Sequence, residues 1–165
     1  MGTILTPDPL RRRLLGAVPL LAASALLLPV PAALAADHRI EMRNIGADNR
    51  QFVFSPDLLF IQPGDQVRFV PVDQGHNSIS VDGMVPPGGE TWRGAIGQPV
   101  SATLTSEGVY GYRCVPHSAA GMVGLVVVGD ARVNLSAARA VTHRGRAGQA
   151  FAALFDRLDA HLAEG

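Results

Sequence analysis

Residues 109–128 read VYGYRCVPHSAAGMVGLVVV, and this stretch is the most informative part of the 165-residue chain. It begins with a mainly apolar run over residues 109–113 and ends with a continuous apolar run over residues 123–128, each of the length of a β-strand. The loop between the two runs contains Cys114, His117 and Met122. Because a strand that is covered on both sides is continuously apolar, we expect residues 123–128 to form a buried strand.

The chain before this stretch has the pattern of further strands. From Ile40 onward, short runs alternate apolar and polar residues, as in Ile40 and Met42 beside their charged neighbours. Glycine, proline and aspartate separate these runs, and residues 63–65, Pro-Gly-Asp, are typical of a type II turn. The pattern predicts an all-β sandwich.

After residue 130 the apolar period becomes helical. A short helix is predicted around Leu135, Ala138 and Val141, with Asn134 or Ser136 as its N-cap. A longer helix follows, whose apolar residues recur at helical spacing on one face: Phe151, Leu154, Phe155, Leu158 and Leu162. We expect both helices to pack on the sandwich.

The N-terminal segment has the features of an export signal. Three arginines at residues 11–13 precede an apolar stretch over residues 14–34, and Ala33-Leu34-Ala35 has the small-x-small pattern of signal peptidase sites. We therefore predict a signal peptide over residues 1–35, cleaved after Ala35, although an uncleaved membrane anchor is the alternative. The export route is either the general secretory route or, from the paired arginines, the twin-arginine route. Residues 36–165 are predicted to be one domain, with the sandwich over 36–130 and a helical extension over 131–165.

Composition narrows the possible functions. The chain contains 14 arginines, no lysine and 14 acidic residues, and without residues 1–35 its charge is about −2. A nearly neutral domain without a basic run in its sequence is not expected to bind nucleic acid. A single cysteine in an exported chain cannot form an intramolecular disulfide, so Cys114 is an inert core thiol, an intermolecular link, a nucleophile or a metal ligand.

Four residues form a candidate metal site: His76, Cys114, His117 and Met122. Each residue alone fits an ordinary structural role, as a turn histidine, a core thiol or a packing methionine. Together they supply two imidazoles, a thiolate and a weak thioether, which is the donor set of a blue-copper electron-transfer site. Zinc prefers four strong donors, so it suits this set less well.

The sequence resembles the pseudoazurins, small periplasmic copper proteins of the cupredoxin fold. The resemblance rests on Gly75-His76-Asn77, on residues 112–117 and on residues 121–124, followed by the apolar strand and the two helices. It implies a cupredoxin-like Greek-key β-sandwich with two C-terminal helices, monomeric, that binds one copper ion and carries single electrons. It also implies an upstream donor, a reductase such as copper nitrite reductase as acceptor, and no membrane contact after signal cleavage.

The same resemblance assigns roles to residues around the four ligands. It implies that Asn77 donates its backbone N–H to the Cys114 sulfur and links the two ligand loops through its side chain. Pro116 carries no N–H and cannot offer a second such bond. Pro116, Ala119 and Ala120 are expected to form an apolar docking patch around the His117 edge.

In one respect the chain departs from its relatives. Pseudoazurins usually surround the copper end with lysines, whereas this chain has Gln74 and Asp82 at two such positions and keeps one charge, Arg113. We therefore expect electrostatic steering to be weak or differently arranged.

Three other functions could use some of the same residues. An enzyme with Cys114 as nucleophile and His117 as base leaves His76 and Met122 without a role, so we do not expect an enzyme. A copper storage or delivery protein uses the same ligands, and an amicyanin-like carrier serves a different redox partner. The remaining histidines, His38, His143 and His161, are expected to be surface residues.

Overall fold

The computed structural model describes Gly2 and residues 35–164, so the predicted signal peptide lies almost entirely outside the described residues. The described part contains the following elements: β1 (Asp37–Ile45), β2 (Gln51–Ser55), β3 (Leu58–Ile61), β4 (Gln66–Pro71), β5 (Ile79–Ser80), β6 (Val100–Thr103), β7 (Gly108–Arg113), a 3-10 turn η1 (Ser118–Ala120), β8 (Val123–Val128), a second 3-10 turn η2 (Ala131–Val133), α1 (Leu135–Ala140) and α2 (Arg146–Glu164). No helix in this part combines the length and apolar character needed to cross a bilayer.

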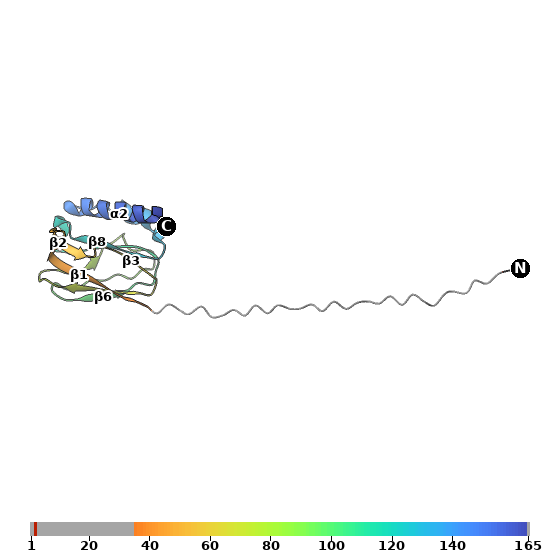
Figure 1. Cartoon of the computed structure of the whole chain (residues 1–165), viewed down its shortest axis with the longest axis horizontal. Helices are drawn as coiled ribbons and strands as arrows, with labels where there is room; N and C mark the ends of the chain where they lie inside the picture. The colour runs from red at the N-terminus through yellow and green to blue at the C-terminus, as the bar shows by residue number, and fades with distance from the viewer. Residues whose placement is uncertain (1, 3–34, 165) are drawn as a thin grey trace. The chain divides into compact units, whose positions relative to one another are not determined.

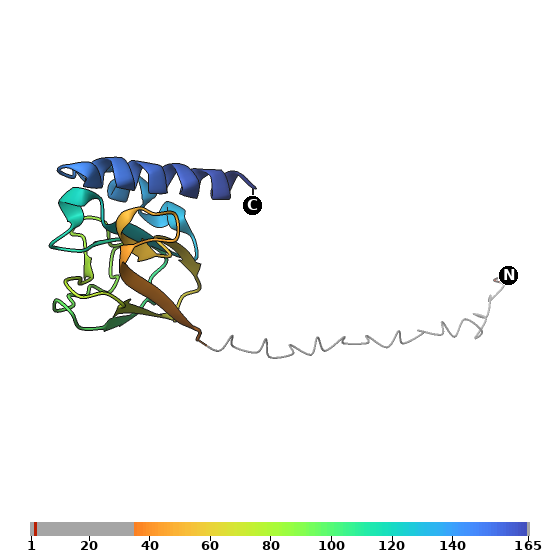
Figure 2. The same ribbon diagram turned by 60° about the vertical axis from the view of Figure 1, so that its left-hand side comes forward.

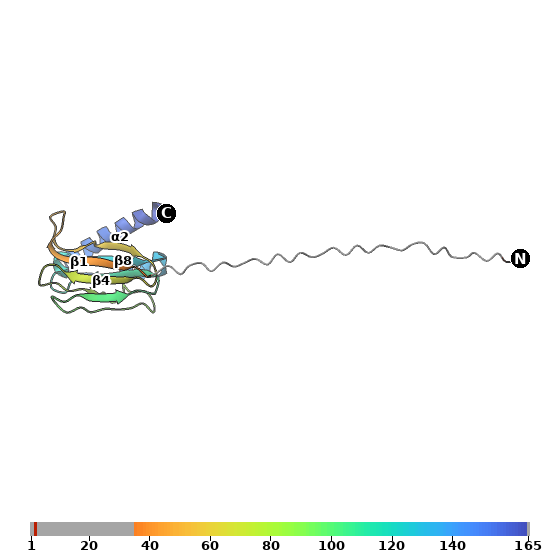
Figure 3. The same cartoon turned by 60° about the horizontal axis from the view of Figure 1, so that its bottom comes forward.

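The strands form two sheets that pack face to face (Figure 1). One sheet has the order β2-β1-β4-β6, and the other has the order β3-β8-β7-β5. The β1–β4 and β3–β8 pairs are parallel, and the remaining pairs are antiparallel. Seen from the side of the first sheet, β1 and β4 run alongside each other (Figure 3). The predicted β-sandwich with C-terminal helices is therefore confirmed.

The core lies between the sheets, and a second apolar layer lies under α2. Ile40 and Met42 of β1 are fully buried between the sheets, as their alternation with charged residues predicts. All six residues of β8 are buried because α2 covers the opposite face of its sheet (Figure 2). The continuous apolar run is thus explained by a strand covered on both sides.

The two predicted helices are present, with three differences in detail. Asn134 occupies the predicted N-cap position of α1, but its side chain makes no capping hydrogen bond, because it instead accepts the Val109 N–H at 2.7 Å and donates to the Val109 carbonyl at 2.9 Å. Val141 follows the last turn of α1 rather than lying in it. On α2, Leu162 is 43% exposed, because the apolar contact with the sandwich ends near Leu158.

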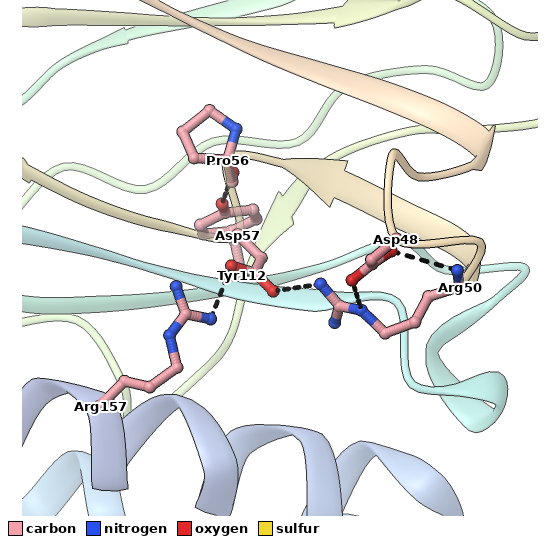
Figure 4. Close-up of polar contacts among 6 residues, drawn as sticks. All are labelled: Asp48, Arg50, Pro56, Asp57, Tyr112 and Arg157. Carbon is pink, nitrogen blue, oxygen red and sulfur yellow. Dashed lines mark hydrogen bonds and ion pairs between the residues drawn. The ribbon is translucent and has the colours of Figure 1, made fainter.

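An ion-pair group fixes α2 to the turn between β2 and β3 (Figure 4). Asp57 accepts hydrogen bonds from Arg50 at 3.1 Å and from Arg157 of α2 at 2.8 Å. The Tyr112 hydroxyl, at the far side of the same turn, donates to the Pro56 carbonyl at 3.4 Å. These contacts connect α2 and the β2–β3 turn to the strand that leads into Cys114.

Candidate metal centre

The four predicted ligands come from two loops at one end of the sandwich. His76 lies between β4 and β5, whereas Cys114 directly follows β7 and His117 and Met122 belong to the loop that enters β8. Within that loop the Met122 N–H donates to the His117 carbonyl, and the Cys114 N–H donates to the Met122 carbonyl, both at 3.1 Å. Gly121, with φ at +100°, closes the loop in a conformation that favours glycine. The side chains of His76, Cys114 and Met122 are fully buried, and His117 is half-buried.

Three of the four side chains converge on one point. The Nδ1 atoms of His76 and His117 are 3.1 Å apart, and they lie 3.8 Å and 3.7 Å from the Cys114 sulfur. A point equidistant from the three atoms lies about 2.1 Å from each, within the roughly 2.0–2.3 Å of metal bonds to imidazole and thiolate. The residues present therefore fit a metal ion held by two nitrogens and one sulfur.

The His76 ring is oriented by a polar contact on its far side. Its Nε2 hydrogen-bonds the Asn44 side-chain oxygen at 3.0 Å, and the Asn44 backbone N–H donates to Asp73 at 2.6 Å. This contact assigns the proton to Nε2 and leaves Nδ1 free to face the centre. Burial, together with the neighbouring His117, lowers the pKa of His76, and this favours the neutral imidazole that a metal ligand requires.

Asn77 joins the two ligand loops. Its side-chain nitrogen donates to the Gly94 carbonyl at 3.0 Å, and its side-chain oxygen accepts the Val115 N–H at 2.8 Å. Asn77 is 95% buried, since 5% of its surface is exposed, so both bonds lie largely out of water. The side-chain link between the loops is present as the resemblance implies.

The Cys114 thiol lies in an apolar setting with backbone donors aimed at it. Burial raises the pKa of Cys114, and the backbone N–H groups of Asn77 and His117 act in the opposite direction. Pro116 offers no N–H, yet the loop supplies a second donor one residue later. Both donors favour the thiolate that a bound metal requires.

Phe52 is a site residue that the sequence did not reveal. Its ring stacks on His117, with centroids 4.1 Å apart and planes 5° from parallel, and it meets His76 edge-on at 6.1 Å. Phe52 has a φ of +55°, which is uncommon for a bulky residue. It belongs to β2, 65 positions before His117, and no sequence motif connects the two.

The surface around the loop is apolar, with arginines beside it. Pro116, Ala119 and Ala120 are all exposed around the half-buried His117. Beyond them, four arginines from three segments lie near the loop: Arg93, Arg113, Arg144 and Arg146. Arg144 and Arg146 are close together in the sequence, and the fold brings them near Arg93 and Arg113.

Two of the three other histidines differ from the expectation of plain surface residues. His38 is half-buried and hydrogen-bonds Asp65 at 2.9 Å. His143 is half-buried against Phe151, with ring centroids 4.2 Å apart. His161 is exposed and lies over Phe60.

Comparisons with known proteins agree with this geometry. The sequence profile of the copper binding proteins, plastocyanin/azurin family, matches residues 40–129. The chain is 42% identical to a pseudoazurin of Methylorubrum extorquens, over 80% of this chain and 86% of that protein, and 38% identical to one of Paracoccus pantotrophus, over 87% and 93%. It also superposes on a solved pseudoazurin from Sinorhizobium with a TM-score of 0.73 at 41% identity, covering 74% of this chain and 96% of that one.

Proposed function

Because the chain belongs to the pseudoazurins, within the plastocyanin/azurin family of copper-binding proteins, we propose that it carries single electrons in the periplasm to a reductase such as copper nitrite reductase. The observation that carries the proposal is the triangle of two imidazole nitrogens and one thiol sulfur, sized for one metal ion. A carrier of this kind is not an enzyme, and it works as a monomer.

We assign the copper ligands as His76, Cys114 and His117, with Met122 as the weak fourth donor. When bound, copper supplies a one-electron couple, and this mixed donor set suits both oxidation states. The chain keeps the donors in place by the Asn44 contact to His76, the Asn77 link between the loops and the two backbone bonds inside the Cys114–Met122 loop. Held in this way, the site changes little between oxidation states.

The electron leaves through the His117 edge in this proposal. His117 is half-buried and so reaches solvent, whereas His76, Cys114 and Met122 are fully buried. Pro116, Ala119 and Ala120 surround it with a small apolar surface that a partner can cover while excluding water. Contacts of this size suit a short-lived encounter, as electron transfer requires.

The arginines beside the loop favour a partner with an acidic surface. Arg93, Arg113 and Arg144 form no ion pair with any residue that the structure describes, so their charges are available to attract carboxylates. Steering by such charges raises association rates at low salt. It takes the place of the lysines found in relatives.

Export and processing after Ala35 are part of the proposal. The Ala36 nitrogen lies 2.8 Å from a carboxylate oxygen of Asp65, which also pairs with His38. Cleavage after Ala35 would convert this amide nitrogen into an ammonium group, and the hydrogen bond would become a charge-assisted pair. Asp65 therefore favours an amino terminus at this position, and residues 36–165 would form the single mature domain.

The rival functions fit the site less well. A nucleophilic Cys114 would need access to a substrate, but its side chain is fully buried, and its sulfur is as close to His76 as to His117. A copper delivery protein needs a labile, accessible site, and three of the four proposed ligands are closed off.

Substitution in the docking patch tests the electron-transfer proposal. We expect Ala120→Asp to lower the second-order rate constant for electron transfer to copper nitrite reductase at least tenfold, because it buries a charge at the contact. Ala153→Asp, on an exposed position of α2, is the matched control and should transfer electrons at the wild-type rate. Equal rates for all three proteins, measured by stopped-flow absorbance, would contradict the assigned surface.

A further inference from the structure

A cavity of about 420 Å³ lies beside the ligand loop and outside the metal centre. Its walls include Arg113 at the end of β7, Ser118 of the loop, Arg93 before β6, and Thr142 and Arg144 between α1 and α2. The α1–α2 connection packs directly on the loop, since a Cβ added to Gly145 would stand 3.0 Å from the Ala119 carbonyl oxygen. Three arginines from distant parts of the sequence therefore line one recess.

These arginines differ from most others in the described part of the chain. Six arginines form ion pairs with carboxylates: Arg39, Arg43, Arg50, Arg132, Arg139 and Arg157. Among residues 35–164, five arginines have neither an ion pair nor a side-chain hydrogen bond to another residue, and three of the five line the recess, namely Arg93, Arg113 and Arg144, whereas Arg68 and Arg146 do not. Arg113 is half-buried, and a charged group that is partly removed from water without a partner is costly.

The remaining charges around the recess do not neutralise the arginines. Asp82 also lines the cavity, but it forms no ion pair with a described residue, and one carboxylate leaves a surplus of positive charge. α2 starts at Arg146 beside the recess, Ala147 lines it, and the first turn of α2 contains no acidic residue. The helix therefore adds the positive end of its dipole to the same space. Burial lowers the pKa of His143, which also lines the recess, and the positive charge of Arg113 lowers it further.

We propose that this recess binds a small inorganic oxyanion of the phosphate or sulfate class. Guanidinium groups match such anions because their paired N–H donors bind two oxygens at once. Thr142, which also lines the recess, carries a further hydroxyl donor. The cavity falls within the volume range of small-ligand sites and exceeds the size of one such ion.

An anion in this recess would also affect the copper centre. Arg113 directly precedes Cys114, and Ser118 directly follows His117. A bound negative charge there stabilises the oxidised, more positive form of the centre. We therefore expect the reduction potential to fall with phosphate concentration until the recess is saturated.

Isothermal titration of the copper-loaded protein with inorganic phosphate, at fixed ionic strength, tests the binding directly. We expect one saturable site, with affinity reduced at least tenfold in Arg113→Gln and in Arg144→Gln. Arg144 lies on an exposed connection, so its substitution keeps the test informative if Arg113→Gln folds poorly. Arg68→Gln is the matched control, because Arg68 is exposed on β4, away from the recess, and should leave binding unchanged.

Absence of saturable phosphate or sulfate binding at concentrations up to tens of millimolar would overturn the proposal. A loss of affinity in Arg68→Gln equal to that in the Arg113 and Arg144 variants would also overturn it. If the Arg113 and Arg144 variants slow electron transfer to a reductase while phosphate still fails to bind, the recess receives a partner carboxylate instead and the oxyanion proposal is wrong. The binding measurement does not depend on electron transfer. Failure of either proposal can therefore be recognised separately.

Discussion

Replacing Asn77 by alanine should destabilise the protein strongly, because one side chain holds both ligand loops. The substitution removes the donor to the Gly94 carbonyl at 3.0 Å and the acceptor of the Val115 N–H at 2.8 Å. Both backbone groups would lose their partners, and the one at Gly94 lies in a buried position. A backbone group left unsatisfied in the interior costs about 1–3 kcal/mol.

The expected loss of stability follows from these two contacts. Val115 is 43% exposed, so water can reach its N–H more readily than it can reach the Gly94 carbonyl. We therefore expect a loss of about 2–4 kcal/mol in the free energy of unfolding. For a domain of this size, this corresponds to a fall in Tm of roughly 6–20 °C.

Thermal unfolding of the copper-free protein, followed by far-ultraviolet circular dichroism, measures the effect without a contribution from the metal. Gln149→Ala is the control, because Gln149 is exposed on α2 and its substitution should leave Tm unchanged. In the copper-loaded variant the Asn77 backbone N–H is retained, so the position of the thiolate absorption band should change little. A Tm for Asn77→Ala within about 1 °C of the wild type would refute the role of this side chain as a link between the loops.

Two further predictions concern the His117 ring and the amino terminus. Phe52→Leu removes the ring that stacks on His117 with centroids 4.1 Å apart. The π face of this ring stabilises the more positive, oxidised state of the centre, so its loss should raise the reduction potential. The expected rise is about 20–65 mV, the one-electron equivalent of 0.5–1.5 kcal/mol. Voltammetry checks this, and an unchanged or lower potential would contradict it. Hydrogen bonds from the Ala36 and Gln62 N–H groups, with His38, lower the pKa of Asp65 from 3.8 to about 2. A carboxylate whose pKa is lowered by folding stabilises the folded state at pH values above its pKa in the unfolded chain. Asp65→Asn should therefore be less stable than the wild type at pH 7. The difference in stability should vanish as the pH falls from 3.8 to below about 2. A constant difference in Tm across that range would show that Asp65 acts through packing instead.

Much of the fold could be predicted because its signals are local. The six residues of β8 are apolar in sequence and are covered on both sides in the structure. The apolar positions of α2 were likewise correct up to Leu158, and the error at Leu162 arose because helical periodicity does not show where the underlying sheet ends. Three of the four candidate ligands lie in one short loop, so their spacing alone made them recognisable.

The features of the site that could not be predicted from the sequence depend on contacts between distant segments. The stacking of Phe52 on His117 depends on how the β1–β2 turn folds over the metal end, and an isolated phenylalanine in a strand resembles any core residue. The recess formed by Arg93, Arg113 and Arg144 arises because β7, the segment before β6 and the α1–α2 connection meet in space. The composition shows that the chain is nearly neutral, but it does not show that unpaired positive charges gather at the metal-binding end of the sandwich.

The visible absorption spectrum of the copper(II)-loaded protein tests the central claim most directly. If Cys114 binds copper as a thiolate between His76 and His117, the wild-type protein must show an intense charge-transfer band in the visible range, and Cys114→Ser must lack it because a hydroxyl is a harder and less acidic donor. A colourless wild-type complex, or a Cys114→Ser variant with an unchanged spectrum, would contradict the assignment of this site.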